Sequence, residues 1–249
     1  MTRMRLSKDK VLLTVVRLQR RIGERFPNAG LLNVAGEMVT LTKEAHDDLD
    51  TIGRPAYGMR ILSALSIGAI VLGAIGAVVL TLQLETRTTH IGIMDLIQVS
   101  EALVNDLILL GAAIWFFAML ERRKKRARVS AAVNKFRSLA HLIDVHQLQK
   151  NPEVIGEESR ATASSPVRDM TPFEMGRYFD YCSELLSLVG KIAALYGDQF
   201  EDPVVLEMVN DLESLSIGLQ RKIWQKIMVM ESRATRMGLK LEPPTAEPA

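Results

Sequence analysis

The longest uncharged stretch of the chain constrains its fold more than any other feature. From Ile61 to Leu82 the sequence reads ILSALSIGAIVLGAIGAVVLTL, 22 residues without a charge. A helix rises about 1.5 Å per residue, so this stretch reaches roughly 33 Å and can cross a hydrocarbon core of about 30 Å. A helix of a soluble protein is rarely apolar on every face over such a length. We therefore expect a membrane-spanning helix over about 60–83.

A second apolar stretch follows, and it is shorter. Residues 107–120 read LILLGAAIWFFAML, only 14 residues, whereas a spanning helix needs about 20. A helix that crosses must therefore begin near residue 100 and carry Asn105 and Asp106 into the membrane. We expect a second span over about 100–120 and a short outside loop over 84–96, which together make residues 57–121 a transmembrane hairpin.

A basic run directly after the second stretch indicates how the hairpin is oriented. The run contains the cations Arg122, Arg123, Lys124, Lys125, Arg126 and Arg128, whereas the expected outside loop contains only Arg87. Basic residues beside a span mark its cytoplasmic end. We expect both termini in the cytoplasm and, by this rule, a location in the cell inner (plasma) membrane. The run is first a determinant of topology and second a site for anionic lipid headgroups.

Outside the expected hairpin the sequence favours amphipathic helices. Residues 1–56 contain a helix capped by Ser7 that runs to about Arg25, then a second helix over about 31–49 that residues 50–55 break. Nothing stops the helix of the second span until Asn151-Pro152, so we expect it to continue to about residue 150 as a long cytoplasmic helix.

The cytoplasmic region 122–241 also contains a loop over 153–170 and two more helices. These cover about 172–197 and 203–237, and each begins with a capping residue followed by proline. Residues 242–249 are expected to be a disordered tail. The predicted class is all-α: a two-span transmembrane helical hairpin with a cytoplasmic α-helical bundle. The expected core residues, one apolar stripe per helix, are Val11, Leu12, Val15, Val16, Leu18, Ile22, Leu31, Val34, Met38, Leu41, Ala45, Val129, Val133, Phe136, Leu139, Ala140, Ile143, Phe179, Cys182, Leu185, Leu186, Val189, Ile192, Tyr196, Val205, Leu206, Val209, Leu212, Leu219, Ile223, Ile227 and Met230.

Polar residues follow one face of the outer part of the second span. Asp95, Gln98, Glu101 and Asn105 recur at helical spacing, and Asp106 lies beside them. An ionisable group at the centre of a bilayer costs about 2.5–3.5 kcal/mol, and less near the interface. Interfacial water, a polar partner across the helices, or a wet ion path would each offset this cost.

Small residues recur every four positions in the first span, at Ala69, Gly73 and Ala77. Such rows allow helix backbones to approach closely in lipid. The row serves packing within the hairpin or packing between copies of the chain. We expect a homo-oligomer, because two helices alone cannot shelter both the small residues and the acidic stripe.

The residues that could carry catalysis have simpler interpretations. Of the four histidines, His46 and His90 are isolated, whereas His141 and Asp144 are expected to form a hydrogen-bonded pair on one helix face, with His146 pointing elsewhere. The only cysteine, Cys182, lies on an apolar helical face and is expected to be a small core residue. We therefore expect no enzyme activity, no metal and no cofactor.

The expected function follows from this architecture. The net charge of only +2 does not indicate a nucleic-acid-binding protein, so we expect no nucleic-acid partner. The leading hypothesis is a non-enzymatic integral membrane protein that lies in the lipid bilayer, self-associates, and anchors a cytoplasmic helical interaction module for a protein partner. The alternative is an oligomeric cation channel or transport component, with the acidic stripe ringing its outer mouth.

Overall fold

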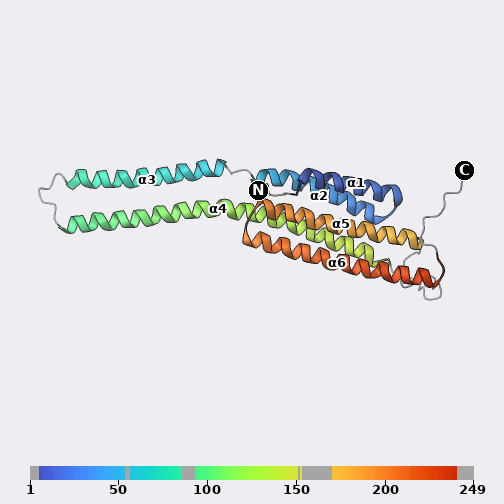
Figure 1. Cartoon of the computed structure of the whole chain (residues 1–249). Coiled ribbons are helices and arrows are strands. Elements are labelled where there is room, and N and C mark those ends of the chain that lie inside the picture. The colour runs from blue at the N-terminus through green and yellow to red at the C-terminus, as the bar shows by residue number, and fades with distance from the viewer. Residues whose placement is uncertain (1–5, 54–56, 86–92, 151, 153–169, 240–249) are drawn as a thin grey trace, which may run out of the picture. The chain divides into compact units, whose positions relative to one another are not determined.

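The computed structural model describes residues 6–53, 57–85, 93–150, 152 and 170–239 (Figure 1). Within this part of the chain the regular structure is helical, which confirms the all-α class. The helices in chain order are α1 (Lys8–Arg25), α2 (Gly30–Gly53), α3 (Tyr57–Glu85), α4 (Ile93–Leu148), α5 (Pro172–Gln199) and α6 (Pro203–Arg236). Residues 153–169 of the expected loop, the expected tail and His90 lie outside the described residues.

The chain divides into two compact units, and the division falls within α4. One unit comprises Met1–Gly53 together with Arg128–Ala249, and the other comprises Arg54–Ala127. The first unit therefore contains α1, α2, the second part of α4, α5 and α6. The second unit contains α3 and the first part of α4.

Helix α5 is the centre of the five-helix bundle in the first unit. It packs extensively against α6, α1 and α2, and Figure 1 shows it between the α1–α2 pair and α6. Its buried side chains include Phe179, Leu185, Val189, Ile192 and Tyr196, which lie on more than one face of the helix. A helix that buries several faces is the core element of its domain. The second part of α4 completes the bundle by burying Val129, Val133, Phe136, Leu139, Ala140 and Ile143.

The predicted helix starts are confirmed in atomic detail. The Ser7 side chain accepts a hydrogen bond from the backbone of Lys10 at the start of α1. At α5, Thr171 and Glu174 form a reciprocal capping box, and a proline occupies the first helical position between them. The Asp202 carboxylate caps α6 by accepting from the backbone of Val204. Each cap satisfies a backbone N–H that the helix itself leaves without a partner.

Three helix ends differ from the sequence expectation. Helix α2 continues past residue 49 to Gly53, because Ile52 is buried and extends the apolar stripe by one turn. Helix α5 continues past Gly197 to Gln199, and Gly197 is buried beside Leu206 and Val209 of α6. Helix α4 begins at Ile93, inside the expected loop 84–96. Tertiary packing at the first two ends overrides the weak local signal of glycine and aspartate.

The expected core residues are buried or partly buried, with one exception. Leu206 of α6 is 41% exposed, so its assignment to the core was wrong. Val205, Val209 and Leu212 share the buried face at helical spacing, and Leu206 points about 100° away from Val205. Apolar character alone did not distinguish these two neighbours.

The candidate membrane-spanning stretch begins in the second unit. In the described residues, one helical stretch, Val104–Leu148, contains an 18-residue window that is long and apolar enough to cross a membrane, with a mean hydropathy of 1.6. None of that window is buried. The stretch Ala64–Gly73 of α3 is a shorter apolar helix by the same criterion. In the part of the chain that the structure describes, one candidate span is thus found where the sequence suggests two.

Candidate functional site

The polar stripe of the expected second span lies on α4. Glu101 and Asn105 are one helical turn apart and both exposed, whereas Asp106 is partly buried. Their apolar neighbours Val104 and Leu107 are also exposed. The side chains of Asp95 and Gln98 lie outside the described residues. The described part of the stripe therefore presents a carboxylate and an amide on an otherwise apolar, open surface.

The row of small residues on α3 also faces open space where it is described. Ala69 and Gly73 are exposed, and the side chain of Ala77 is outside the description. No described atom lies within 4 Å of a Cβ built on Gly73, and the same holds for Gly68 and Gly76. At these positions the described residues do not form the close helix–helix contact that the row would allow.

The basic run after the apolar window of α4 is mostly exposed. Arg122, Arg123, Lys124 and Arg128 are exposed. Lys125 is partly buried, and its ammonium lies 3.2 Å from the carboxylate of Glu121 one turn earlier. Arg126 is partly buried. Because consecutive residues of a helix are about 100° apart, Arg122, Arg123 and Lys124 surround the helix rather than forming one face.

The expected His141–Asp144 pair is not found among the described residues. His141 is exposed, and Asp144 accepts a hydrogen bond of 2.6 Å from the side-chain amide of Gln147 instead. Gln147 is only 1% exposed, so its amide needs a nearby acceptor. His146 packs against the start of α2, where a Cβ built on Gly30 would lie 2.5 Å from its ring.

His46 is not isolated, contrary to the sequence expectation. Its Nε2 atom on α2 lies 2.9 Å from a carboxylate oxygen of Asp9 on α1. The two residues are far apart in the sequence, and the antiparallel packing of α1 on α2 brings them together. The contact links the two N-terminal helices. In the described residues, no group of three or more His, Cys, Asp and Glu side chains has the arrangement to hold a metal ion.

The prediction that Cys182 is a core residue is confirmed. The side chain is fully buried in α5, and burial raises the pKa of its thiol above the usual range, although Lys226 opposes this shift. Removing the thiolate from water disfavours the charged, nucleophilic form. The arrangement keeps the sulfur protonated and inert.

Lys226 of α6 holds the end of α4, a contact that sequence reasoning missed. Its ammonium donates to the backbone carbonyls of Gln147 at 2.8 Å and Lys150 at 3.2 Å. It also lies 5.7 Å from the centre of the Phe179 ring. Burial lowers the pKa of Lys226, and the charge of Asp144 partly opposes that effect. A cation at a helix C-terminus donates to carbonyls that otherwise lack partners, and it interacts favourably with the negative end of the helix dipole.

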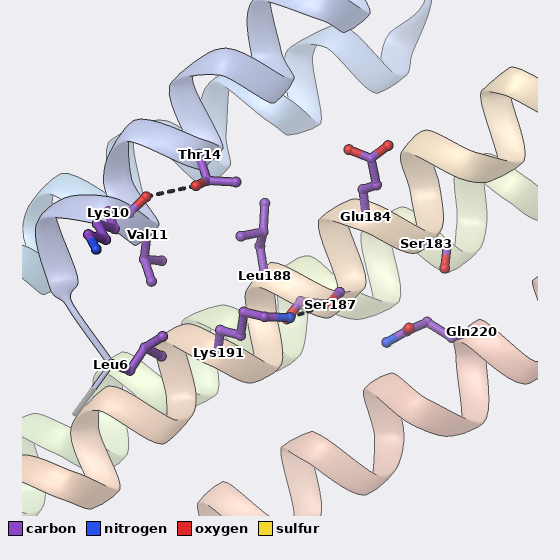
Figure 2. Close-up of a pocket in the computed structure, with 10 residues that line it drawn as sticks. All are labelled: Leu6, Lys10, Val11, Thr14, Ser183, Glu184, Ser187, Leu188, Lys191 and Gln220. Atoms are coloured by element: carbon purple, nitrogen blue, oxygen red, sulfur yellow. Dashed lines mark hydrogen bonds between the residues drawn. The ribbon is translucent and has the colours of Figure 1, made fainter. Parts of the chain in front are cut away.

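A cavity of about 520 Å³ opens between α1, α5 and α6 (Figure 2). Its lining mixes apolar, hydroxyl, amide and charged side chains: Leu6, Lys10, Val11, Thr14, Ser183, Glu184, Ser187, Leu188, Lys191 and Gln220. The Lys191 ammonium lies 2.6 Å from the Ser187 hydroxyl, and both residues line the cavity. No sequence pattern predicts this cavity, because its three walls come from segments far apart in the chain.

Comparison of the chain with models of known protein families, with curated proteins and with solved structures finds no match.

Proposed function

We propose that the chain is a non-enzymatic integral membrane protein, in which α3 and the first part of α4 form a two-span hairpin that anchors a cytoplasmic helical bundle. The observation that carries the proposal is the apolar window of α4, which has a mean hydropathy of 1.6 and no buried residue. An apolar surface of this extent is unfavourable in water, whereas in hydrocarbon it needs no cover.

Helix α3 supports the second half of the hairpin. It has 29 residues and therefore reaches about 43 Å, which exceeds the thickness of a hydrocarbon core. Ile61, Leu65, Leu72 and Ile75 are exposed along it. Large apolar side chains that point outward over several turns suit contact with lipid tails.

The exposed cations of α4 support a cytoplasmic location for the bundle. Arg122, Arg123 and Lys124 follow the apolar window directly, as the basic flank of an inner (plasma) membrane span does on its cytoplasmic side. In that position they also suit the phosphates of anionic lipids. Trp115 is 65% exposed about two turns earlier, at the level where interfacial aromatic residues gather.

The exposed polar groups of α4 support self-association. Glu101 and Asn105 would contact lipid tails in a lone hairpin, and each would leave hydrogen-bonding groups without partners there. The open surface at Ala69 and Gly73 of α3 has room for a neighbouring helix. A homo-oligomer covers both surfaces at once. The bundle, with its amphipathic helices, then acts as an interaction module for a cytoplasmic partner.

The proposal is tested by extraction and by topology mapping. Membranes from cells that express the full chain are washed with alkaline carbonate, and reporter tags at each terminus are assayed for accessibility from each side. We expect the protein to resist carbonate, to require detergent, and to have both tags in the cytoplasm. A protein that stays soluble without detergent, or tags in opposite compartments, would contradict the proposal.

A matched charge substitution sharpens the test. Replacing Arg122, Arg123 and Lys124 together by glutamine should produce a mixed orientation of the hairpin. Replacing Arg221, Lys222 and Arg236 of α6, which are also exposed, should leave the orientation unchanged. Equal effects of the two triple substitutions would show that the basic run does not determine topology.

A cation pore is the second candidate function, favoured by the exposed Glu101 and Asn105 beside the partly buried Asp106. An oligomer that turns this face inward would line a path with carboxylate and amide oxygens. The full chain reconstituted in planar bilayers should then conduct cations, and Asp106→Asn should change the conductance or selectivity. Asp211→Asn in the bundle serves as the control. Reconstituted oligomers without conductance would eliminate this candidate.

A further inference from the structure

A second cavity, smaller than the one at Ser187, lies between α2, α4 and α5, and its volume is about 220 Å³. A water molecule takes up about 30 Å³ in the liquid, so the cavity has room for roughly seven waters or for one small organic molecule. Ala45 of α2 and Ala131 and Ala132 of α4 line it, and these short side chains leave the space between the helices unfilled. Charged groups also line it, and a polar cavity of this size holds water or a ligand, because only apolar cavities stay dry.

The packing of α2 against α4 determines which charged groups meet at this cavity. The Lys135 ammonium of α4 donates to the Glu44 carboxylate of α2 at 2.8 Å, and the first residue of α2 lies against His146 near the end of α4. Residue numbers thus rise along α2 as they fall along α4, so the two helices are antiparallel. Asp48 lies one turn after Glu44 and is therefore level with the alanines of α4, and Arg128 lies one turn before those alanines. A carboxylate and a guanidinium therefore lie at neighbouring levels of the same cavity.

Two of the charged groups at the cavity have no ion-pair partner. Glu44 and Lys135 neutralise each other, whereas neither Asp48 nor Arg128 forms an ion pair or a side-chain hydrogen bond with a described residue. Asp48 is partly buried and Arg128 is exposed. The hydrogen bond to Glu44 raises the pKa of Lys135, and the charge of Asp48 adds to that shift. The cavity thus contains two carboxylates and two cations, and it offers one group of each sign to a ligand.

A buried tyrosine hydroxyl faces the same space. Tyr196 of α5 lines the cavity and is only 1% exposed. Burial raises the pKa of Tyr196, and the charges of Asp48 and Glu44 add to that shift, so its hydroxyl lies on the side of these carboxylates. Within the described ranges the hydroxyl has no hydrogen-bond partner. Since buried hydroxyl groups are normally hydrogen-bonded, a molecule in the cavity supplies the missing acceptor.

We propose that this cavity binds a free α-amino acid with a small side chain. The ammonium group of the ligand donates to the Asp48 carboxylate, and its carboxylate accepts from the Arg128 guanidinium and the Tyr196 hydroxyl. Each contact to a charged group is of the strong, charge-assisted kind. Because the charges that line the cavity sum to zero, a zwitterion satisfies the two unpaired groups together, whereas a simple anion or cation satisfies only one. The site lies within the bundle, so this inference goes beyond the membrane anchoring proposed above and does not depend on it.

Calorimetric titration of the full chain in mild detergent tests the ligand class. The probes are glycine and free alanine, with acetate and methylammonium as controls that each present only one of the two charges. We expect the amino acids to bind, and the controls to bind about 10-fold more weakly or less, because each control lacks one charge-assisted contact. If acetate or methylammonium binds as tightly as glycine, the zwitterion assignment is wrong. If neither amino acid binds with the ligand raised to about 1 mM, the cavity holds water only and the proposal fails.

Two matched pairs of variants test the position of the site. Tyr196→Phe keeps the ring and removes only the hydroxyl, so we expect it to weaken glycine binding by about 10-fold, whereas Tyr178→Phe, at a buried tyrosine that does not line the cavity, should not. Asp48→Asn should lower the affinity for glycine to that for acetate, and the neighbouring Asp47→Asn should leave it unchanged. Circular dichroism checks that each variant is folded. Equal binding within either pair of folded variants would show that the ligand does not occupy this cavity.

Discussion

The buried thiol of Cys182 makes the stability of the bundle sensitive to alkaline pH. Burial raises its pKa in the folded chain above the ordinary value of 9.0, so the folded state retains a proton that the unfolded state releases. The stabilisation from the neutral thiol is complete below pH 9 and is lost as the pH rises further. Tyr178 and Tyr196, whose pKa values burial also raises above 10.0, act in the same direction.

We therefore expect the free energy of unfolding to fall as the pH rises through 9 and 10. The contribution of Cys182 should begin near pH 9 and approach a limiting slope of about 1.4 kcal/mol per pH unit above pH 10. Lys226 contributes a slope of the opposite sign. Burial lowers its pKa, so the folded chain releases this proton at a lower pH than the unfolded chain does, and the cost of burying the charge disappears as the pH rises. Denaturant unfolding of the full chain in detergent, followed by circular dichroism from pH 7 to 10, measures the slope. Cys182→Ala should have a shallower slope, and an unchanged slope would contradict this assignment.

Lys226 has a second consequence at the scale of single residues. Lys226→Met removes both hydrogen bonds to the end of α4 and leaves the carbonyl oxygens of Gln147 and Lys150 without that donor. Since burial offsets part of the gain, we expect a loss of about 1–2 kcal/mol and a melting temperature lower by about 3–6 °C. Lys222→Met, four residues earlier and exposed, should change the melting temperature by less than about 1 °C. Equal melting temperatures for the two variants would show that Lys226 does not hold the end of α4.

Among the secondary-structure elements, α5 depends on its capping box. Thr171→Ala removes the side chain that accepts from the backbone of Glu174, and we expect a loss of about 1 kcal/mol. Glu174→Gln is the matched control, because glutamine also completes a capping box. Thermal unfolding should place the glutamine variant near the wild type and the alanine variant about 2–4 °C lower. If both variants unfold together with the wild type, the cap does not limit the stability of α5.

The elements were largely predictable from the sequence because their signals are local. Caps such as Thr171 act within three or four residues, and apolar stripes repeat every turn, so both can be recognised in a short window. The errors occurred where distant packing decides the outcome. Gly197 stays helical because α6 lies against it, and Leu206 is exposed because its neighbour Val205 takes the inward position.

At the scale of the whole molecule, the sequence indicated residue types but not which of them meet. The capping of α4 by Lys226 joins groups 76 and 79 positions apart. The contact of His46 with Asp9 spans 37 positions, and the cavity at Ser187 has walls from three helices. No short-range pattern encodes such contacts. The polar stripe and basic run of α4 were recognisable because each lies on one continuous helix.

The discontinuous composition of the bundle predicts that α1 and α2 depend on the end of the chain. Phe26, which follows α1, packs its ring against Tyr178 and Tyr181 of α5. A chain truncated after Met170 lacks these rings and all of α5, so its residues 1–53 should be cleaved rapidly by a protease that leaves the full chain intact. Equal cleavage rates for the truncated and full chains would show that α1 and α2 fold independently.

The same arrangement sets an order of events during synthesis. The bundle is built from Met1–Gly53 and Arg128–Ala249, so its first two helices leave the ribosome before the helices that cover them exist. Between Gly53 and Pro172 lie nearly 120 residues, which take roughly 6–24 s to translate. Until the part of α4 that begins at Arg128 emerges, α1 and α2 have only each other and the cell's chaperones, and α5, which packs against both, follows later still. The nascent protein is most vulnerable to aggregation during that interval.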